Sequence, residues 1–255
     1  MLVDYKILRF DGLKGGLETK EDVVAFEDII NLHINGKFYT AFHCIPYRLR
    51  ELVIGRLLTD GIIESFEDIP EIDFSGKNVY VKISEEKAIK ALEKPALIDA
   101  ICSGSIPLSI LKKFQRSNHY LKFDVEAIFK AVEVLNNKPF IYRASGGTHS
   151  AALLDEKGEL IAFAEDIGRH NAIDKIVGES VSKGVKFDRL ILASSGRLTS
   201  EMVIKAVWIM VPIMVSISAP TSMGIKIAET FGLTLIGFAR GRKFNIYTFP
   251  DRIKK

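Results

Sequence analysis

The segment "RLILASSGRLTSEMVIKAVWIMVPIMVSISAPTSMGIKIAETFGLTLIGFA", residues 189–239, contains three short apolar strands separated by two helical stretches. The strands are "RLILASS", "IMVSIS" and "TLIGFA", and the first helix, from about Ser200 to Val211, is apolar nearly all round. Short strand–helix links of this kind predict parallel strands with right-handed crossovers. A helix that lacks a polar face belongs between a sheet and further cover. The segment therefore predicts a layered α/β unit.

The α/β unit extends toward the N-terminus from this segment. Residues 150–166 have the pattern of two strands joined by a turn at 156–158, and an apolar stripe with helical spacing follows Asp124. Aspartate in that position is typical of a helix N-cap. We therefore predict a mixed sheet in a domain that spans residues 119–255.

Residues 1–118 form a smaller, β-rich N-terminal region by the same criteria. Asn35-Gly36 lies between two strand-like runs, which is a strong hairpin signal. Pro46 is expected to open a helix, and a short helix is expected near Glu85–Leu92. The whole chain is predicted to be α/β in its larger part and α+β overall.

Composition excludes several classes of protein. The chain has 255 residues, of which 47% are hydrophobic, and a formal net charge of +3, so general nucleic-acid binding is not expected. It has two cysteines and no zinc-ligand spacing, which favours a reducing compartment and no metal site. The longest apolar run, 206–217, contains Pro212 and is too short for a membrane span. We expect a cytoplasmic protein without a signal peptide or membrane segment.

Two hydroxyl-rich loops follow the first two parallel strands. They are "SSGRLTS" (194–200) and "SAPTS" (218–222), and both lie at helix N-termini. Free backbone amides and the helix dipole favour phosphate there, and a guanidinium adds a bidentate donor. The alternative is that the hydroxyls only cap the helices. The candidate ligand residues in these loops are Ser195, Arg197 and Ser218.

The third parallel strand leads into a cationic turn, "FARGRKFN" (238–245). Glycine permits close approach of a ligand, the cations suit a pyrophosphate, and an aromatic ring can stack on a base. A hairpin turn with solvated charges explains the same residues. The candidates here are Phe238, Ala239, Arg240, Gly241, Arg242 and Lys243.

The stretch "EDIGRHNAIDKIVG" (165–178) is rich in different hydrogen-bonding side chains, whereas surface helices repeat Glu and Lys. We interpret it as a binding or structural hydrogen-bond network, in which Asp174 can orient His170 at i and i+4. A glycine pair before the preceding strand permits close approach of a ligand, although a turn alone explains it. The candidates from these two places are Gly146, Gly147, His149, Asp166, Arg169, His170 and Asn171.

The two cysteines have different surroundings. Cys44 ends an apolar strand and is expected to be buried as a small hydrophobic residue. Cys102 lies in "ICSGS", a Ser-Gly-Ser context that does not bury a side chain well. We expect Cys102 to be accessible and Cys44 to be structural.

Several blocks of the sequence resemble those of a known family. The blocks "SGGTHSAALLDEKGELIAFAEDIGRHNAIDKIVG", "SGR", "SAPTS", "GFARGRKFNIYTFP" and "CIPYRLRELVIGRLLTDGII" are similar to those of the FdhD/NarQ family of formate dehydrogenase accessory sulfurtransferases. The resemblance implies a cytidine-deaminase-like fold for the larger domain. The zinc-ligand pattern of deaminases is absent from the sequence, so deaminase chemistry is not implied.

The resemblance also implies a reaction and its partners. A cysteine desulfurase supplies sulfur as a persulfide on Cys102, and the sulfur passes to the molybdenum cofactor for formate dehydrogenase. The bis-molybdopterin guanine dinucleotide form of that cofactor carries pyrophosphates, so a guanine nucleotide is a mimic of half of it. The family resemblance further implies a homodimer.

One position departs from the family pattern. Many members have Cys-x-x-Cys, where this chain has Cys102-Ser103-Gly104-Ser105. A single thiolate can hold a persulfide, but release of sulfur through an internal disulfide is put in doubt. The missing second thiol favours an alternative, a non-catalytic chaperone that binds the cofactor. A nucleotide hydrolase with His170 as base is a further alternative, although the sequence has no evident carboxylate cluster for magnesium.

Overall fold

The computed structural model describes residues 1–13, 15–69, 71–92 and 121–254. The predicted loop around Cys102 and the predicted domain boundary at 118/119 lie outside these residues. Both stay predictions.

The larger unit is built on a six-stranded sheet with the order β13-β12-β11-β10-β8-β9. β10, β11 and β12 are parallel, as the sequence predicts, and the other neighbours are antiparallel. The strands are β8 (His149–Leu154), β9 (Leu160–Asp166), β10 (Ile191–Ser194), β11 (Ile213–Ser216), β12 (Thr234–Arg240) and β13 (Lys243–Ile246). This mixed sheet confirms the predicted fold class.

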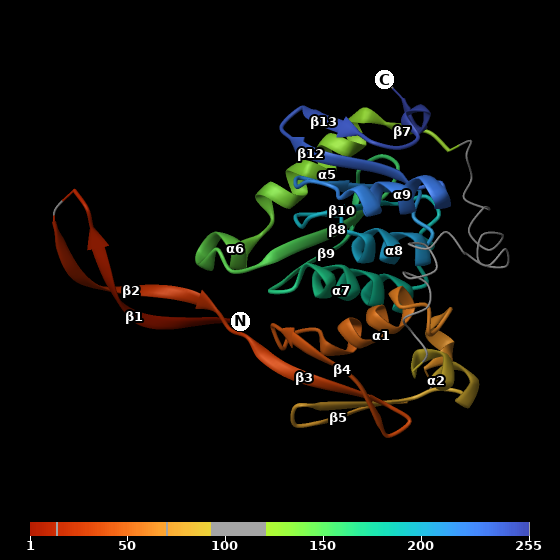
Figure 1. Cartoon of the computed structure of the whole chain (residues 1–255), viewed down its shortest axis with the longest axis horizontal. Helices are drawn as coiled ribbons and strands as arrows, with labels where there is room; N and C mark the ends of the chain where they lie inside the picture. The colour runs from red at the N-terminus through yellow and green to blue at the C-terminus, as the bar shows by residue number, and fades with distance from the viewer. Residues whose placement is uncertain (14, 70, 93–120, 255) are drawn as a thin grey trace.

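Helices cover both faces of this sheet (Figure 1). One face packs on α5 (Val125–Asn137) through Ala152, Leu154 and their neighbours. The other face packs on α7 (Arg169–Ser182), α8 (Ser200–Trp208) and α9 (Ser222–Phe231). Because both faces are covered, the central strands are apolar along their whole length, as parallel strands in such sheets usually are.

The N-terminal region adds two more layers below α7 and α8. Helix α1 (Leu49–Thr59) packs on α7, and a four-stranded sheet packs on α1, within one continuous apolar core. The sheet order is β4-β3-β6-β5, and helix α2 (Glu85–Leu92) follows it. The strands are β3 (Asp28–Ile34), β4 (Lys37–Cys44), β5 (Glu71–Ser75) and β6 (Asn78–Lys82).

The predicted hairpin and short helix are confirmed in this region. Asn35 and Gly36 both have positive φ, 47° and 80°, as a two-residue turn between antiparallel strands requires. The first helix begins at Leu49 and not at Pro46, because Arg48 is the N-cap in a left-handed conformation, with φ 54°. Cys44 is fully buried, as predicted.

Glycines allow α1 and α7 to cross with their backbones in contact. A Cβ atom on Gly55 would collide with the backbone oxygen of Asp174, and one on Gly178 would collide with the backbone oxygen of Glu51. This crossing joins the N-terminal layers rigidly to the α/β unit.

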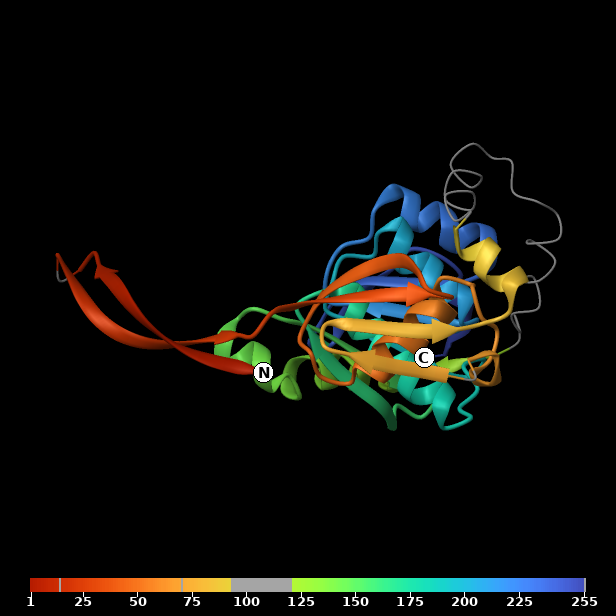
Figure 2. The same cartoon turned by 90° about the horizontal axis from the view of Figure 1, so that it is seen from below.

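A hairpin arm, β1 (Leu2–Asp11) and β2 (Gly16–Ala25), extends away from the rest of the chain (Figures 1 and 2). Its ten residue pairs form a separate two-stranded sheet, and its base touches the short helix α6 (Phe140–Ser145). The sequence analysis did not predict this arm. Most of its side chains are exposed, including large apolar ones near the tip.

Short elements complete the described residues. They are the 3-10 turns η1 (Phe66–Asp68) and η2 (Pro250–Arg252) and the two-stranded parallel pair of β7 (Phe123–Asp124) and β14 (Ile253–Lys254). The buried guanidinium of Arg252 fixes the C-terminal segment, because it donates to the backbone oxygens of Pro212 and Gly232. Within the described ranges, every helix is too short or too polar to cross a membrane.

Candidate functional site

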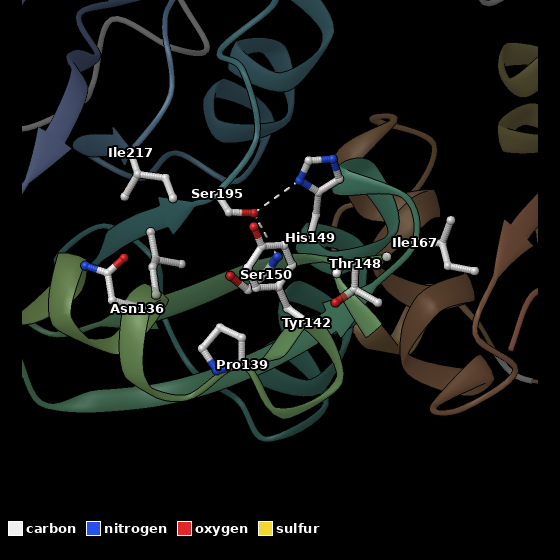
Figure 3. Close-up of a pocket in the computed structure, with 12 residues that line it drawn as sticks. Asn136, Pro139, Tyr142, Thr148, His149, Ser150, Ile167, Ser195 and Ile217 are labelled. Atoms are coloured by element: carbon white, nitrogen blue, oxygen red, sulfur yellow. Dashed lines mark hydrogen bonds between the residues drawn. The ribbon is translucent and has the colours of Figure 1, made fainter. Parts of the chain in front are cut away.

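A cavity of about 510 Å³ opens between α6, the end of α5 and the edge where β10 and β11 end (Figure 3). At this edge the first of the two loops that the sequence singled out contributes Ser195, and Ile217 comes directly before the second. The lining residues are Leu135, Asn136, Pro139, Tyr142, Gly146, Gly147, Thr148, His149, Ser150, Ile167, Ser195 and Ile217. The size suits a nucleotide-sized ligand, and four of the predicted site residues are in this set.

Ser195 and His149 form the polar wall of this cavity (Figure 3). Oγ of Ser195 accepts from the backbone N–H of Ser150 at 2.9 Å and lies 3.2 Å from Nδ1 of His149. The serine hydrogen is therefore free to point to Nδ1, which leaves Nε2 of the ring as a donor. Burial first, and then Arg169 and Arg197, lower the pKa of His149, so the ring is neutral at pH 7.

Two arginines stand beside this wall without a carboxylate. Among the described residues, neither Arg169 nor Arg197 has an acidic partner within salt-bridge distance, and Nε of Arg169 is buried without a hydrogen-bond partner. Gly196 makes room for this arrangement, because a Cβ there would lie 2.7 Å from Cδ of Arg169. Guanidinium groups without a carboxylate partner near the His149 wall favour an anionic ligand.

The hydroxyls of the two edge loops mainly hold the loops together. Ser216 Oγ donates to the backbone oxygen of Gly196 at 2.7 Å and accepts from the N–H of Ser218. Two backbone bonds join the loops directly: the N–H of Leu198 donates to the oxygen of Ala219, and the N–H of Thr221 donates to the oxygen of Leu198. Thr221 caps α9 by accepting from the N–H of Gly224. Some of the hydroxyls thus fix the backbone, as the capping interpretation predicts, and Ser195 lines the cavity. The anion-binding interpretation of the loops stays a prediction.

The side chains of the cationic turn, 238–245, point to different places: Phe238 lies beside the second loop, and Arg242 lies on α5. Phe238, with φ 52°, is exposed, and its N–H donates to the backbone oxygen of Ser218. Arg242 points instead to α5, where it pairs with Glu126 and lies over the ring of Phe129 at 4.4 Å. Ala239 is fully buried in the core below the sheet. The exposed side chains at this turn are Phe238, Arg240, Arg242 and Lys243, with Gly241 at φ 55°.

The polar face of α7 is a buried structural network. Asp166 is fully buried and accepts from Nζ of Lys175 at 2.6 Å, from the side chain of Asn171 at 2.9 Å, and from the N–H groups of Ile45 and Gly168. This confirms the interpretation as a hydrogen-bond network. It also leaves Asp166 and Asn171, both predicted to bind the cofactor, without a surface toward the cavity.

His170 is oriented differently from the sequence-based expectation. Asp174 accepts from Thr59 and Lys205, both at 2.7 Å, and Nε2 of His170 lies 3.5 Å from a carboxylate oxygen of Glu201. Burial, followed by the charge of Lys205, lowers the pKa of His170 to about 4. The imidazole is therefore neutral at pH 7.

Helix α6 supplies cavity residues that the sequence analysis missed. Tyr142 belongs to this six-residue helix, and Thr148 follows it. The helix is too short to give a periodic apolar pattern, and Phe140 and Tyr142 are exposed. The only sequence signal in this region was the glycine pair at 146–147.

Comparisons with known proteins agree with this description. A crystal structure of a formate dehydrogenase accessory protein from Desulfotalea psychrophila matches 99% of both chains, with a TM-score of 0.80 and 24% sequence identity, which supports the fold. The sulfur carrier protein FdhD of Wolinella succinogenes is 36% identical over 244 residues, 93% of this chain and 84% of its own. The protein of the same name from Sulfolobus acidocaldarius is 37% identical over 237 residues, 92% of each chain.

The family model for FdhD/NarQ proteins matches residues 25–254, which include the α/β unit, the four-stranded sheet and all of the cavity lining. The arm falls almost entirely before this range. With this match and the identity to the relatives above, the chain belongs to the FdhD/NarQ family.

Proposed function

We propose that this chain is a sulfur carrier that takes sulfur as a persulfide on Cys102 and passes it to the molybdenum cofactor of a formate dehydrogenase. The observation that carries the proposal is the identity of 36–37% over more than nine tenths of the chain to relatives named sulfur carrier protein FdhD. A reducing compartment such as the cytoplasm suits this chemistry.

The loading step needs only one thiolate of this chain. The thiolate of Cys102 attacks the outer sulfur of a persulfide on a cysteine desulfurase. A new S–S bond forms on Cys102 while the S–S bond of the donor breaks, and the donor cysteine leaves as a thiolate. No net oxidation occurs, and the absent second cysteine of the family pattern is not required for this step.

The cavity and the arginines beside it are the proposed binding place of the cofactor, which is the substrate here. The guanidinium groups of Arg169 and Arg197, both close to His149, are the proposed donors for a pyrophosphate. The cavity offers the polar edge of Ser195 and His149 next to Tyr142, which suits a guanine base. Phe238 and Arg240 are proposed to contact the ligand from the neighbouring turn.

The first prediction concerns these phosphate contacts. Arg197→Ala is expected to weaken the binding of guanosine diphosphate about tenfold, the scale of one charge-assisted hydrogen bond. Arg242→Ala is the matched control, because Arg242 is held on α5 by Glu126 and is expected to leave the affinity unchanged. Calorimetry on both variants gives the comparison. Equal losses, or a loss only for Arg242→Ala, would place the phosphate site at the turn instead.

The arm is the proposed basis of a homodimer. Leu8, Phe10 and Leu17 lie on one face of its tip and are each about two thirds exposed, whereas an isolated hairpin is only marginally stable in water. At about 3.3 Å per residue the arm is about 33 Å long. Two arms exchanged about a two-fold axis would cover these apolar side chains, in the way that closed dimers bury a shared patch.

Charged substitutions on the arm test this assembly. Leu8→Glu with Phe10→Glu is expected to convert a dimer to a monomer in light scattering, without changing the melting temperature of the remaining chain by more than a few degrees. Arg9→Glu, which changes the net charge by the same amount on the opposite face of the arm, is the control. A dimer that survives the Leu8 and Phe10 changes would show that the arm does not form the interface.

The alternative function is a chaperone that binds the cofactor without carrying sulfur. Intact mass after incubation with a cysteine desulfurase and cysteine separates the two. A carrier gains the mass of one sulfur atom and loses it on reduction, whereas a pure chaperone keeps its mass.

A further inference from the structure

Glu165 is a half-buried carboxylate on β9 that reaches the first turn of α6. Its Oε2 accepts from the backbone N–H groups of Phe140 and Ile141 at 2.8 and 3.0 Å, and its Oε1 accepts from the N–H of Tyr142 at 2.7 Å. These are the N–H groups that a helix leaves without a partner at its start. One side chain therefore satisfies the whole N-terminus of α6.

The helix has no cap of its own. The N-cap residue is Pro139, which has no hydroxyl or carboxylate and makes no side-chain capping bond. Six residues are far too few for a helix that is stable without external contacts. The position of α6, and of Tyr142 within it, thus depends on a group from another element.

The same carboxylate also holds the far end of the cavity wall. Oγ1 of Thr148 donates to Oε1 of Glu165 at 3.0 Å, immediately after the glycine pair. Glu165 lies opposite Ser150 in the register of β8 and β9, and Ser150 is itself a lining residue. Both Tyr142 and Thr148 line the cavity, so Glu165 fixes the two ends of the segment 140–148 that forms one wall.

We propose that Glu165 is the positioning residue of the ligand cavity: by holding the start of α6 and Thr148 at once, it keeps the wall of the site in its binding geometry. This inference rests on the proposed function, since it takes the cavity as the nucleotide site. Glu165 itself does not line the cavity. Its contribution is preorganisation, which raises affinity by removing the cost of ordering the wall on binding.

Two variants and a control test the role. Glu165→Ala removes all four bonds, and Glu165→Gln keeps the shape but puts an amide NH₂ where one acceptor was. We expect about tenfold weaker binding of guanosine diphosphate for Ala and about threefold for Gln. The control is Glu159→Gln. Glu159 lies just before the same strand, and its exposed carboxylate pairs with Lys130. The control is expected to leave the affinity unchanged.

Hydrogen exchange distinguishes local loosening of α6 from a general loss of stability, because only the first would leave the exchange rates of the core unchanged. The amides of Phe140, Ile141 and Tyr142 are expected to exchange at least tenfold faster in Glu165→Ala, while those in the β8–β10 core keep their wild-type rates. If Glu165→Ala fails to fold, Glu165→Gln carries the same comparison.

The outcomes separate this inference from the function on which it rests. Fast exchange in α6 with unchanged nucleotide affinity would overturn the positioning role and leave the proposed site intact. A wild-type protein that does not bind guanosine diphosphate would overturn the proposed ligand and this role together. Unchanged exchange at 140–142 in both variants would show that Glu165 does not hold the helix.

Discussion

Cys102→Ser is expected to abolish sulfur uptake completely. In the proposed reaction the attacking atom is the thiolate of Cys102, and a hydroxyl in its place does not attack a persulfide at neutral pH. Intact mass after incubation with a cysteine desulfurase and cysteine is expected to show one added sulfur atom in the wild type and none in the variant. Guanosine diphosphate binding is expected to stay unchanged.

Cys44 is the matched control for this experiment. It is fully buried, and burial together with the nearby charge of Asp166 raises the pKa of its thiol to about 12. Cys44 is therefore a thiol, not a thiolate, at neutral pH and has no access to a partner protein. Cys44→Ala is expected to load sulfur normally and to lose about 1–2 kcal/mol of stability from the small cavity it leaves. Normal loading of Cys102→Ser would show that Cys102 is not the sulfur acceptor, whereas a wild-type protein that gains no sulfur would favour the chaperone function.

Asp166→Ala is expected to lower the free energy of unfolding by about 3–5 kcal/mol, the cost of leaving one partner of a buried ion pair behind. Lys175 is fully buried, and its ammonium group has Asp166 at 2.6 Å and the backbone oxygen of Ile45 at 3.0 Å as partners. Without the carboxylate, the N–H of Ile45 and the side chain of Asn171 also lose an acceptor. Urea denaturation followed by circular dichroism measures the change.

Two further variants make this result specific. The double variant Asp166→Leu with Lys175→Met removes both charges and is expected to recover part of the lost stability, because no buried charge remains unpaired. Arg189→Ala breaks an exposed pair with Glu156 and is expected to cost less than about 1 kcal/mol. A single Asp166→Ala variant as stable as Arg189→Ala would contradict the structural role of this network.

The polar face of α7 was predicted only in part from the sequence. The variety of its side chains correctly indicated a hydrogen-bond network, but not which side of the helix would be covered. His43 and Ile45 of the N-terminal region accept from Asn171 and Lys175 across more than a hundred residues of sequence. Since that contact depends on how α1 and β4 pack on α7, no local pattern could distinguish a ligand contact from an interlayer contact.

The ion-pair partners of the cationic turn could not be predicted from the sequence either. Its three cations looked equivalent in sequence, yet Arg242 is neutralised by Glu126, which is 116 residues earlier in the chain. Arg240 and Lys243 of the same turn have no carboxylate within salt-bridge distance among the described residues, and the same holds for Arg169, which belongs to α7, and for Arg197. Coulombic partners are set by the distances in the folded chain, so the sequence could list the cations but could not select among them.

Local sequence patterns were enough to predict the parallel order of β10, β11 and β12, the hairpin at Asn35-Gly36 and the burial of Cys44. Each of these follows from local physics: apolar runs that need cover on both faces, a turn that needs positive φ, and a small apolar side chain at the end of a strand. The wall of the cavity, in contrast, depends on contacts between residues that are far apart in the sequence. Helix α6 is too short to be stable alone, and it exists where it does because Glu165, from a strand later in the chain, satisfies its first three N–H groups.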